Sequence, residues 1–209
     1  MKLYLSSYRL GNYGELLARE VSGKKKIGVI FNALDASTDT AKLKESVQRE
    51  FSDLKALGLD PHQIDLRDYF EENSALGDLL EQFNALWVVG GNSFVLRRAF
   101  SKSGLDQILL RKNNGDTEFL YGGYSAGVVV LTPSLKGIHL MDEPECIPPG
   151  YSEEIIWTGL SIVPFSIVPH YRSVHHETEL ADKAISFMIE HKIPFIALRD
   201  GEVYFRGFS

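Results

Sequence analysis

Residues 119–131 read Phe-Leu-Tyr-Gly-Gly-Tyr-Ser-Ala-Gly-Val-Val-Val-Leu, so a G-x-S-x-G pattern, Gly123 to Gly127, stands between two apolar runs. This arrangement predicts a buried strand that delivers Ser125 onto a tight turn and a helix that leaves the turn. Glycines at both ends of the pattern indicate a crowded backbone in which a Cβ would not fit. We expect the Ser125 hydroxyl to be exposed there, with the amide of Ala126 at the helix N-terminus available to an oxyanion.

Strand-like and helix-like segments alternate on both sides of this stretch. Apolar runs predict strands at 3–5, 27–31, 64–66 and 85–89, and helical periodicity predicts helices at 41–57, 76–83, 93–100 and 105–110. Such alternation predicts a three-layer α/β fold in which a mostly parallel sheet carries helices on both faces. Function collects at the carboxyl ends of the strands in such sheets, and Asn32, Gly90-Gly91-Asn92 and Ser125 all fall at such ends.

The composition is that of an ordinary globular chain. Its 209 residues suffice for one well-buried core, and no repeat or linker divides them, so we predict a single domain over residues 1–209. The net charge of −6 argues against a nucleic-acid partner. One cysteine, Cys146, cannot form an internal disulfide, and no segment is long and apolar enough for a membrane. We therefore expect a cytoplasmic protein that has no membrane partner.

A serine becomes a nucleophile when a base accepts its proton, and histidine is the usual base near neutral pH. Among the six histidines, His170 follows an apolar strand-like run, and we predict that it is this base. Asp200 ends another apolar run and is the candidate acid that orients the base. A hairpin turn at Asp200-Gly201 is the structural alternative. Asp142 and Glu143, in a proline-containing loop over 132–150, are competing acids.

Gly90-Gly91-Asn92 follows the expected strand at 85–89. Two glycines let the backbone approach a ligand closely, so the amides of Gly91 and Ala126 are candidate donors of an oxyanion hole. A plain strand-to-helix turn with Asn92 as the helix N-cap is the alternative, and the two interpretations are compatible. The sequence contains no phosphate-binding glycine-rich loop and no metal-ligand spacing of histidine and cysteine. We therefore predict no cofactor and no metal.

With these residues taken together, the chain resembles the peptidase E family of serine peptidases, which includes aspartyl dipeptidase and, more distantly, cyanophycinase. The resemblance runs nearly from end to end. Four segments carry it in the order of the family: Val88-Val89-Gly90-Gly91-Asn92-Ser93-Phe94, Gly123-Tyr124-Ser125-Ala126-Gly127, Val168-Pro169-His170-Tyr171 and Leu198-Arg199-Asp200-Gly201. The resemblance implies a fold like that of class I glutamine amidotransferases (flavodoxin-like), with Ser125 as nucleophile, His170 as base, and Gly91 and Ala126 as oxyanion donors.

The chain departs from the family in two places. The family's acid is typically a glutamate where this chain has Asp200, and Asp142 is a candidate match to an aspartate in the loop after the elbow helix. Aspartyl dipeptidase reads a substrate carboxylate with an arginine near the start of the helix after the histidine. Here that region reads Glu177-Thr178-Glu179, and Arg172 is the nearby cation. Because two acids would repel an aspartyl side chain, we do not transfer the aspartyl specificity.

The sequence therefore predicts a serine peptidase that hydrolyses short peptides, as a dipeptidase does, through an acyl-enzyme on Ser125. The expected partner is the short peptide substrate, and a homodimer is the candidate assembly. An esterase of the α/β-hydrolase type is one alternative, and it would require Asp142 or Glu143 paired with a later histidine. The other alternative is a non-catalytic binding module on the same fold.

Overall fold

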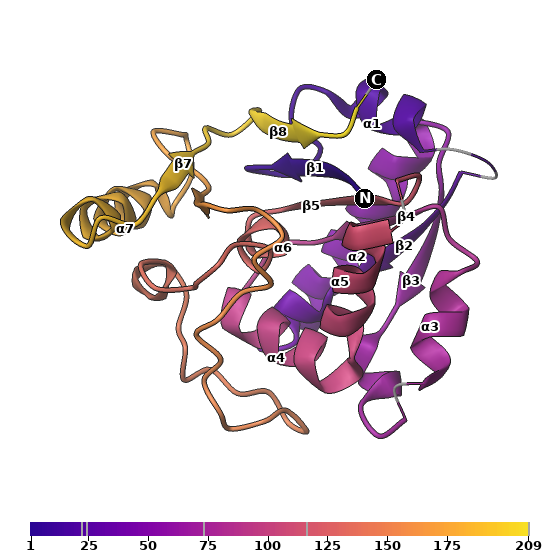
Figure 1. Ribbon diagram of the computed structural model, residues 1–209, viewed down its shortest axis with the longest axis horizontal. Helices are drawn as coiled ribbons and strands as arrows, with labels where there is room; N and C mark the ends of the chain where they lie inside the picture. The colour runs from indigo at the N-terminus through magenta and orange to yellow at the C-terminus, as the bar shows by residue number, and fades with distance from the viewer. Residues whose placement is uncertain (22, 24, 73, 116, 209) are drawn as a thin grey trace.

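The computed structural model describes residues 1–21, 23, 25–72, 74–115 and 117–208. Its centre is a six-stranded sheet with the strand order β3-β2-β4-β5-β1-β8 (Figure 1). Neighbouring strands from β3 to β1 pair in parallel, and β8 pairs antiparallel with β1 at one edge. The strands are β1 (Lys2–Ser6), β2 (Lys26–Ile30), β3 (Asp60–Ile64), β4 (Ala85–Val88), β5 (Leu120–Tyr124) and β8 (Val203–Arg206).

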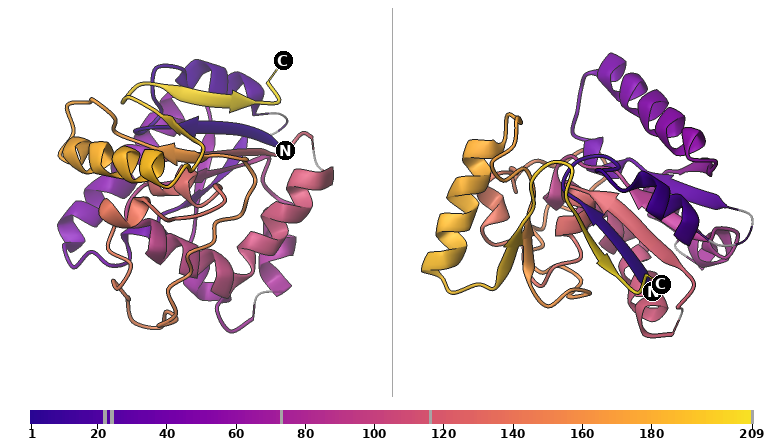
Figure 2. Two further views of the ribbon diagram at one scale, coloured as in Figure 1. Left: turned by 60° about the vertical axis from the view of Figure 1, so that its left-hand side comes forward. Right: turned by 90° about the horizontal axis from the view of Figure 1, so that it is seen from above.

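Helices cover both faces of this sheet, so the predicted three-layer α/β fold is confirmed (Figure 2). Because successive side chains of a strand point to opposite faces, Leu86 and Val88 of β4 pack into one core and Trp87 packs into the other. Trp87 shares its core with α1 (Gly14–Glu20) and α2 (Thr40–Ala56), whereas Leu86 and Val88 face α3 (Ser74–Leu80), α4 (Ser93–Ser103) and α5 (Leu105–Gly115). None of the helices in the described ranges has both the length and the apolar character needed to cross a membrane.

The third strand of the chain lies earlier than the sequence predicts. We expected it at 64–66, but β3 spans Asp60–Ile64, and Leu66 begins the 3-10 helix η2 (Leu66–Tyr69). Proline has no N–H to donate within a sheet, so Pro61 weakens the strand pattern over 60–64. β3 is an edge strand, where a proline is tolerated. Helix α3 also begins and ends earlier, at Ser74–Leu80 rather than 76–83.

A second, two-stranded parallel sheet lies beyond the carboxyl edge of the main sheet (Figure 1). It consists of β6 (Ser166–Val168) and β7 (Phe195–Ala197), connected by α7 (Thr178–Glu190). From β7 the chain passes through Asp200 and then enters β8 of the main sheet. Since β7 and β8 belong to different sheets, the turn at Asp200 is not a β-hairpin, and that interpretation is wrong.

The loop over 132–150 packs against α4. Arg98 of α4 is 1% exposed, and its Nη2 and Nε atoms each donate at 2.8 Å to the carbonyl oxygens of Pro144 and Glu154. The side-chain amide of Asn92 also donates to the Glu143 carbonyl at 2.9 Å. These bonds fix the loop and the segment that follows it along α4, from its N-cap Asn92 to Arg98.

Candidate active site

Ser125 stands on the tight turn that the sequence predicts, between β5 and helix α6 (Ala126–Val129). Its backbone has φ 48° and ψ −117°. Such a conformation costs a non-glycine residue on the order of 1–3 kcal/mol and persists where the surrounding structure enforces it. A Cβ on Gly123 or Gly127 would come within 2.6 Å or 2.3 Å of the Val88 carbonyl oxygen. The two glycines therefore allow the turn to pass this close to β4.

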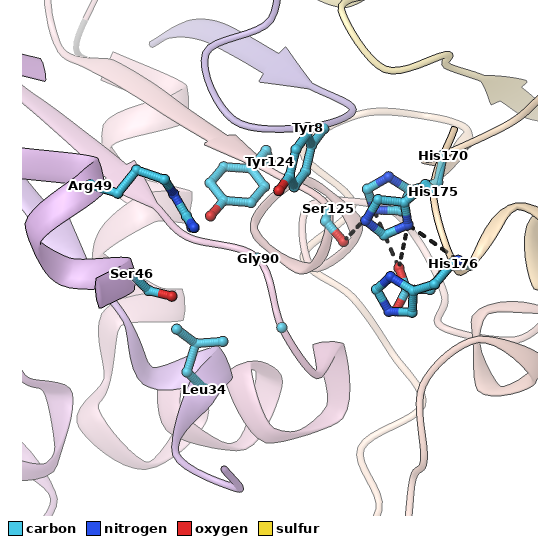
Figure 3. A pocket seen from close by; sticks show the side chains of 12 residues that line it. Tyr8, Leu34, Ser46, Arg49, Gly90, Tyr124, Ser125, His170, His175 and His176 are labelled. Atoms are coloured by element: carbon cyan, nitrogen blue, oxygen red, sulfur yellow. Dashed lines mark hydrogen bonds and ion pairs between the residues drawn. The ribbon is translucent and has the colours of Figure 1, made fainter. Parts of the chain in front are cut away.

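His170 lies between the serine and an acid. Its Nε2 atom is 3.2 Å from Oγ of Ser125 (Figure 3), and its Nδ1 atom is 2.8 Å from Oδ1 of Asp200. Because an ionised carboxylate can only accept, Nδ1 carries the proton, and the lone pair of Nε2 faces the serine hydroxyl. The three residues singled out in the sequence thus meet in the order that proton transfer from a serine requires.

Two further serines hold the histidine and the acid in place. The Ser7 hydroxyl, directly after β1, donates to Oδ1 of Asp200 at 2.9 Å and accepts from the backbone amide of His170 at 2.8 Å. The Ser173 hydroxyl accepts from the Asp200 amide at 2.8 Å. Neither serine stands out in the sequence. The position of Ser7 at the end of the first strand is the one signal that could have found it.

Burial of His170 affects its protonation. Desolvation of the ring lowers its pKa below the ordinary value of 6.5, and the hydrogen bond and charge of Asp200 oppose this shift. The neutral imidazole is the form that can accept a proton. His170 is therefore in its basic form at neutral pH.

This shift predicts the pH dependence of activity. As the pH falls through the pKa of His170, the base is protonated and kcat/KM is lost, so the midpoint of the acid limb is expected below 6.5. Burial also raises the pKa of Asp142 to about 6, so Asp142→Asn serves as the control and should retain the acid limb. A pH profile of kcat/KM for the native chain and for Asp142→Asn measures the acid limb of each. A midpoint above 6.5, or an acid limb that disappears in Asp142→Asn, would contradict the assignment.

The glycine turn after β4 lies directly beside the elbow. A Cβ on Gly90 would be 2.9 Å from Cβ of Ser125, and one on Gly91 would be 2.5 Å from the Ala33 carbonyl oxygen. Gly91 also has φ 145°, which side-chain-bearing residues rarely adopt. Ala126 is the first residue of α6, where amides have no partner within the helix. The amides of Gly91 and Ala126 are therefore the candidate donors to an oxyanion at Ser125.

Asn92 and Asp142 support α4 rather than the histidine. Oδ1 of Asn92 accepts from the Phe94 and Val95 amides at 2.9 and 3.0 Å, so Asn92 is the N-cap of the helix. The half-buried carboxylate of Asp142 accepts from the Ser93 amide at 2.8 Å. Of the competing acids, Asp200 is therefore the one that is hydrogen-bonded to the histidine.

A cavity of about 340 Å³ opens over Ser125 (Figure 3). Arg172, the cation that sequence analysis singled out, does not line it, and the Arg172 guanidinium lies 5.0 Å over the ring of Tyr171. A different cation, Arg49 of α2, lines the cavity. The full lining is Tyr8, Leu34, Ser46, Arg49, Gly90, Gly91, Tyr124, Ser125, His170, His175, His176 and Glu177.

Arg49 lies on the side of Ser125 opposite the histidines (Figure 3). Its Nη2 donates to Oε1 of Glu50 at 3.4 Å, and its buried Nε atom has no hydrogen-bond partner. Glu50 is also hydrogen-bonded to two buried aromatic residues. Its Oε1 accepts from the Tyr124 hydroxyl at 3.0 Å, and its Oε2 accepts from the Trp87 indole N–H at 3.1 Å. The guanidinium therefore has N–H groups left for a ligand. Nothing in the sequence distinguishes this arginine from the other charged residues of an amphipathic helix.

The opposite wall of the cavity carries His175, His176 and Glu177, just before α7. The His175 ring stacks on His170 with centroids 3.7 Å apart and planes 6° apart. Desolvation lowers the pKa of His175 to about 4 and raises the pKa of Glu177. Although the sequence shows no metal-binding spacing, the fold brings ligand atoms of His170, His175 and Glu177 within 4.8 Å of one another.

The sequence of this chain matches those of known peptidases. Residues 16–206 match the sequence profile of Peptidase family S51. The chain is 32% identical over 143 residues to peptidase E of Streptomyces coelicolor, a match that covers 66% of this chain and 54% of that protein. It is 27% identical over 217 positions to a probable alpha-aspartyl dipeptidase of Drosophila melanogaster, covering 95% and 80%. The chain thus matches about half the length of the Streptomyces relative.

Solved structures share the fold. A protein of Listeria monocytogenes EGD-e, classed provisionally as a peptidase E, superposes with a TM-score of 0.71 at 23% identity, covering 100% of this chain and 98% of that one. A peptidase from an acI-B1 Actinobacterium gives a TM-score of 0.71 at 15% identity, covering 98% and 82%. The resemblance to peptidase E is confirmed by these matches together, and the chain belongs to peptidase family S51.

Proposed function

We propose that this chain is a serine peptidase that hydrolyses short peptides through an acyl-enzyme on Ser125. The observation that carries the proposal is the hydrogen-bonded path from Ser125 through His170 to Asp200 on one wall of a cavity. Membership of family S51 supports the same chemistry. The cavity, at about 340 Å³, has the size that a small ligand requires.

The reaction follows from the roles that these groups can take. Nε2 of His170 accepts the Ser125 proton while Oγ attacks the scissile carbonyl, and the carboxylate of Asp200 stabilises the imidazolium. The amides of Gly91 and Ala126 donate to the oxyanion that forms. His170 then passes the proton to the leaving amine, and the acyl-enzyme remains. A water molecule, deprotonated by His170, attacks the ester and restores the free serine.

The two sides of the cavity differ in charge, and this orients the substrate. The leaving amine must lie beside His170, which protonates it, so the acyl residue extends to the other side, toward Arg49 (Figure 3). A guanidinium binds a carboxylate through paired N–H donors, so we propose that Arg49 accommodates an acidic acyl residue. The repulsion expected from Glu177 and Glu179 is then weaker, because Glu177 lies on the leaving-group side and Glu179 does not line the cavity.

Replacing Arg49 with glutamine is expected to lower kcat/KM for an N-terminal aspartyl dipeptide by about 10- to 100-fold, because charge-assisted hydrogen bonds are lost. The asparaginyl dipeptide, of the same shape but without the charge, should change much less. The measurement is kcat/KM on both dipeptides and on their C-terminal amides. Comparing the free acids with the amides shows whether Arg49 binds the side-chain carboxylate or the C-terminal carboxylate of the substrate. Arg172→Gln is the matched control. Equal losses on all four substrates would assign Arg49 to folding instead.

Hydrolysis of a dipeptide panel, run beside simple carboxylic esters, tests the proposed function. The native chain is expected to release free amino acids from dipeptides. Ester hydrolysis without peptide cleavage would favour the esterase, although no hydrogen bond joins Asp142 or Glu143 to a histidine in the part of the chain that the structure describes. A dipeptide that binds specifically and is not cleaved would favour the binding module.

A further inference from the structure

The segment between β6 and α7 places two imidazoles and a carboxylate on one wall of the cavity. Oε2 of Glu177 is 3.4 Å from Nε2 of His170 and 3.7 Å from Nδ1 of His175, and the three sets of ligand atoms lie within 4.8 Å of one another. Neighbouring donors around a tetrahedral zinc ion are about 3.4 Å apart, given bonds of about 2.0–2.1 Å. The carboxylate and the first imidazole therefore already stand at the separation that one zinc ion requires.

His170 has the surroundings of a metal-binding histidine. Its Nδ1 donates to Asp200 at 2.8 Å, which directs the Nε2 lone pair into the cavity. The second ring nitrogen of a metal-bound histidine typically donates its N–H to a carboxylate, which fixes the ring and raises its basicity. Ser7 holds both residues, through the Asp200 carboxylate and the His170 backbone amide. This ligand is therefore rigid before any ion arrives.

Glu177 lies beside imidazoles, which are charged only when they are protonated. Within the described ranges, its ion-pair contacts are with His170, His175 and His176, at 3.4, 3.7 and 3.8 Å, and not with lysine or arginine. Its side chain is only 22% exposed. A largely buried carboxylate without a permanent cation beside it is poorly compensated, and a divalent ion at this point would compensate it.

His175 supplies the third donor once its ring turns. The rings of His175 and His170 are nearly parallel, and lone pairs in two parallel planes do not converge on one point. Nδ1 of His175 accepts from the backbone amide of Glu177 at 3.2 Å. Rotation of the ring about its Cβ–Cγ bond would break both this hydrogen bond and the stack, and it would free a nitrogen for the ion. The cavity is open beside these residues, so water can take the fourth position.

We propose that His170, His175 and Glu177 bind one zinc ion reversibly and that the bound ion inhibits hydrolysis. Two imidazoles and one carboxylate suit zinc, whereas magnesium and calcium prefer oxygen ligands throughout. An ion on Nε2 of His170 occupies the lone pair that would accept the Ser125 proton. The enzyme loaded with zinc then cannot generate its nucleophile. The inhibition rests on the proposed function, whereas the binding rests on the geometry of the cluster.

Calorimetric titration of the native chain with zinc chloride tests the binding. We expect one ion per chain, loss of binding in His170→Gln, and at least about tenfold weaker binding in His175→Gln and Glu177→Gln. His191→Gln, at the C-cap of α7 and outside the cavity, is the matched control and should bind as the native chain does. Melting temperatures without zinc show whether each variant folds. Absence of binding by the native chain, or unchanged affinity in both His175→Gln and Glu177→Gln, would overturn the proposal.

The effect on activity is measured separately. Zinc should inhibit dipeptide hydrolysis over the concentration range in which it binds, a chelator should restore the rate, and magnesium should have no effect. Each variant is compared with its own rate in the absence of zinc. Activation by zinc would overturn the inhibitory role. If zinc binds as expected and no dipeptide is cleaved, the proposed function fails and the inhibitory role with it, while the zinc site remains.

Discussion

The Ser125→Ala variant is expected to hydrolyse dipeptides with kcat/KM lowered by about 10⁴-fold or more. The substitution removes the atom that attacks the carbonyl, and the oxyanion donors and substrate binding account for what activity is left. The fold should persist, because among the described residues the one side chain that is hydrogen-bonded to Ser125 Oγ is His170, at 3.2 Å. The measurement is steady-state hydrolysis together with the melting temperature, which should change by only a few degrees.

Ser161→Ala is the matched control for this variant. Ser161 also has a positive φ, 52°, and does not line the cavity, so the variant repeats the same chemical change at a second positive-φ serine away from the site. Its activity should equal that of the native chain. Retention of more than about a tenth of the native rate in Ser125→Ala, in a folded protein, would refute the nucleophile.

Asp200→Asn is expected to lower kcat/KM by about 10³- to 10⁴-fold with little change in KM. An amide at this position can donate to Nδ1 of His170, which favours the tautomer that carries its proton on Nε2. That tautomer presents an N–H instead of a lone pair to the serine and cannot act as the base. The carboxylate that stabilises the imidazolium is lost at the same time. Steady-state kinetics at a pH above the acid limb measure the effect.

Asp142→Asn separates this result from a general effect of lost charge. Asp142 accepts from the Ser93 amide at 2.8 Å and has no hydrogen bond to His170 among the described residues, and an asparagine oxygen can still accept that bond. We expect a loss of less than about tenfold there. A larger loss in Asp142→Asn than in Asp200→Asn would make Asp142 the essential acid and would reverse the assignment.

The elbow and the layered fold could be predicted because their signals are local. A strand, a turn and a helix follow one another over 119–131, and the glycines mark where the backbone is crowded, as the contacts of Gly123 and Gly127 with Val88 show. Periodicity of 2 and of 3.6 residues reports which side of each element is buried. The strand expected at 64–66 was misplaced, because Pro61 interrupts the strand pattern over 60–64 and is tolerated only since β3 is an edge strand.

The substrate side of the site could not be predicted in this way. The cation that lines the cavity is Arg49 of α2, whereas the sequence pointed to Arg172, close in number to the histidine. The side chain of Arg172 instead covers a neighbouring tyrosine. Nearness in the chain was a poor guide here, because the carboxyl edge of a parallel sheet collects residues from strands and helices that are far apart in sequence.

By itself, the sequence determined the order of the elements and the strained serine turn, and it singled out His170 as the candidate base, because each of these depends on residues that are neighbours in the chain. Only the tertiary structure decided which carboxylate meets His170, since β7 and β8 lie in different sheets and the turn between them brings Asp200 to the ring at 2.8 Å. It also decided the charge around the cavity, with Arg49 on one side of Ser125 and Glu177 on the other. Packing of distant elements sets these distances, so they cannot be predicted from the residues that neighbour each position in the chain.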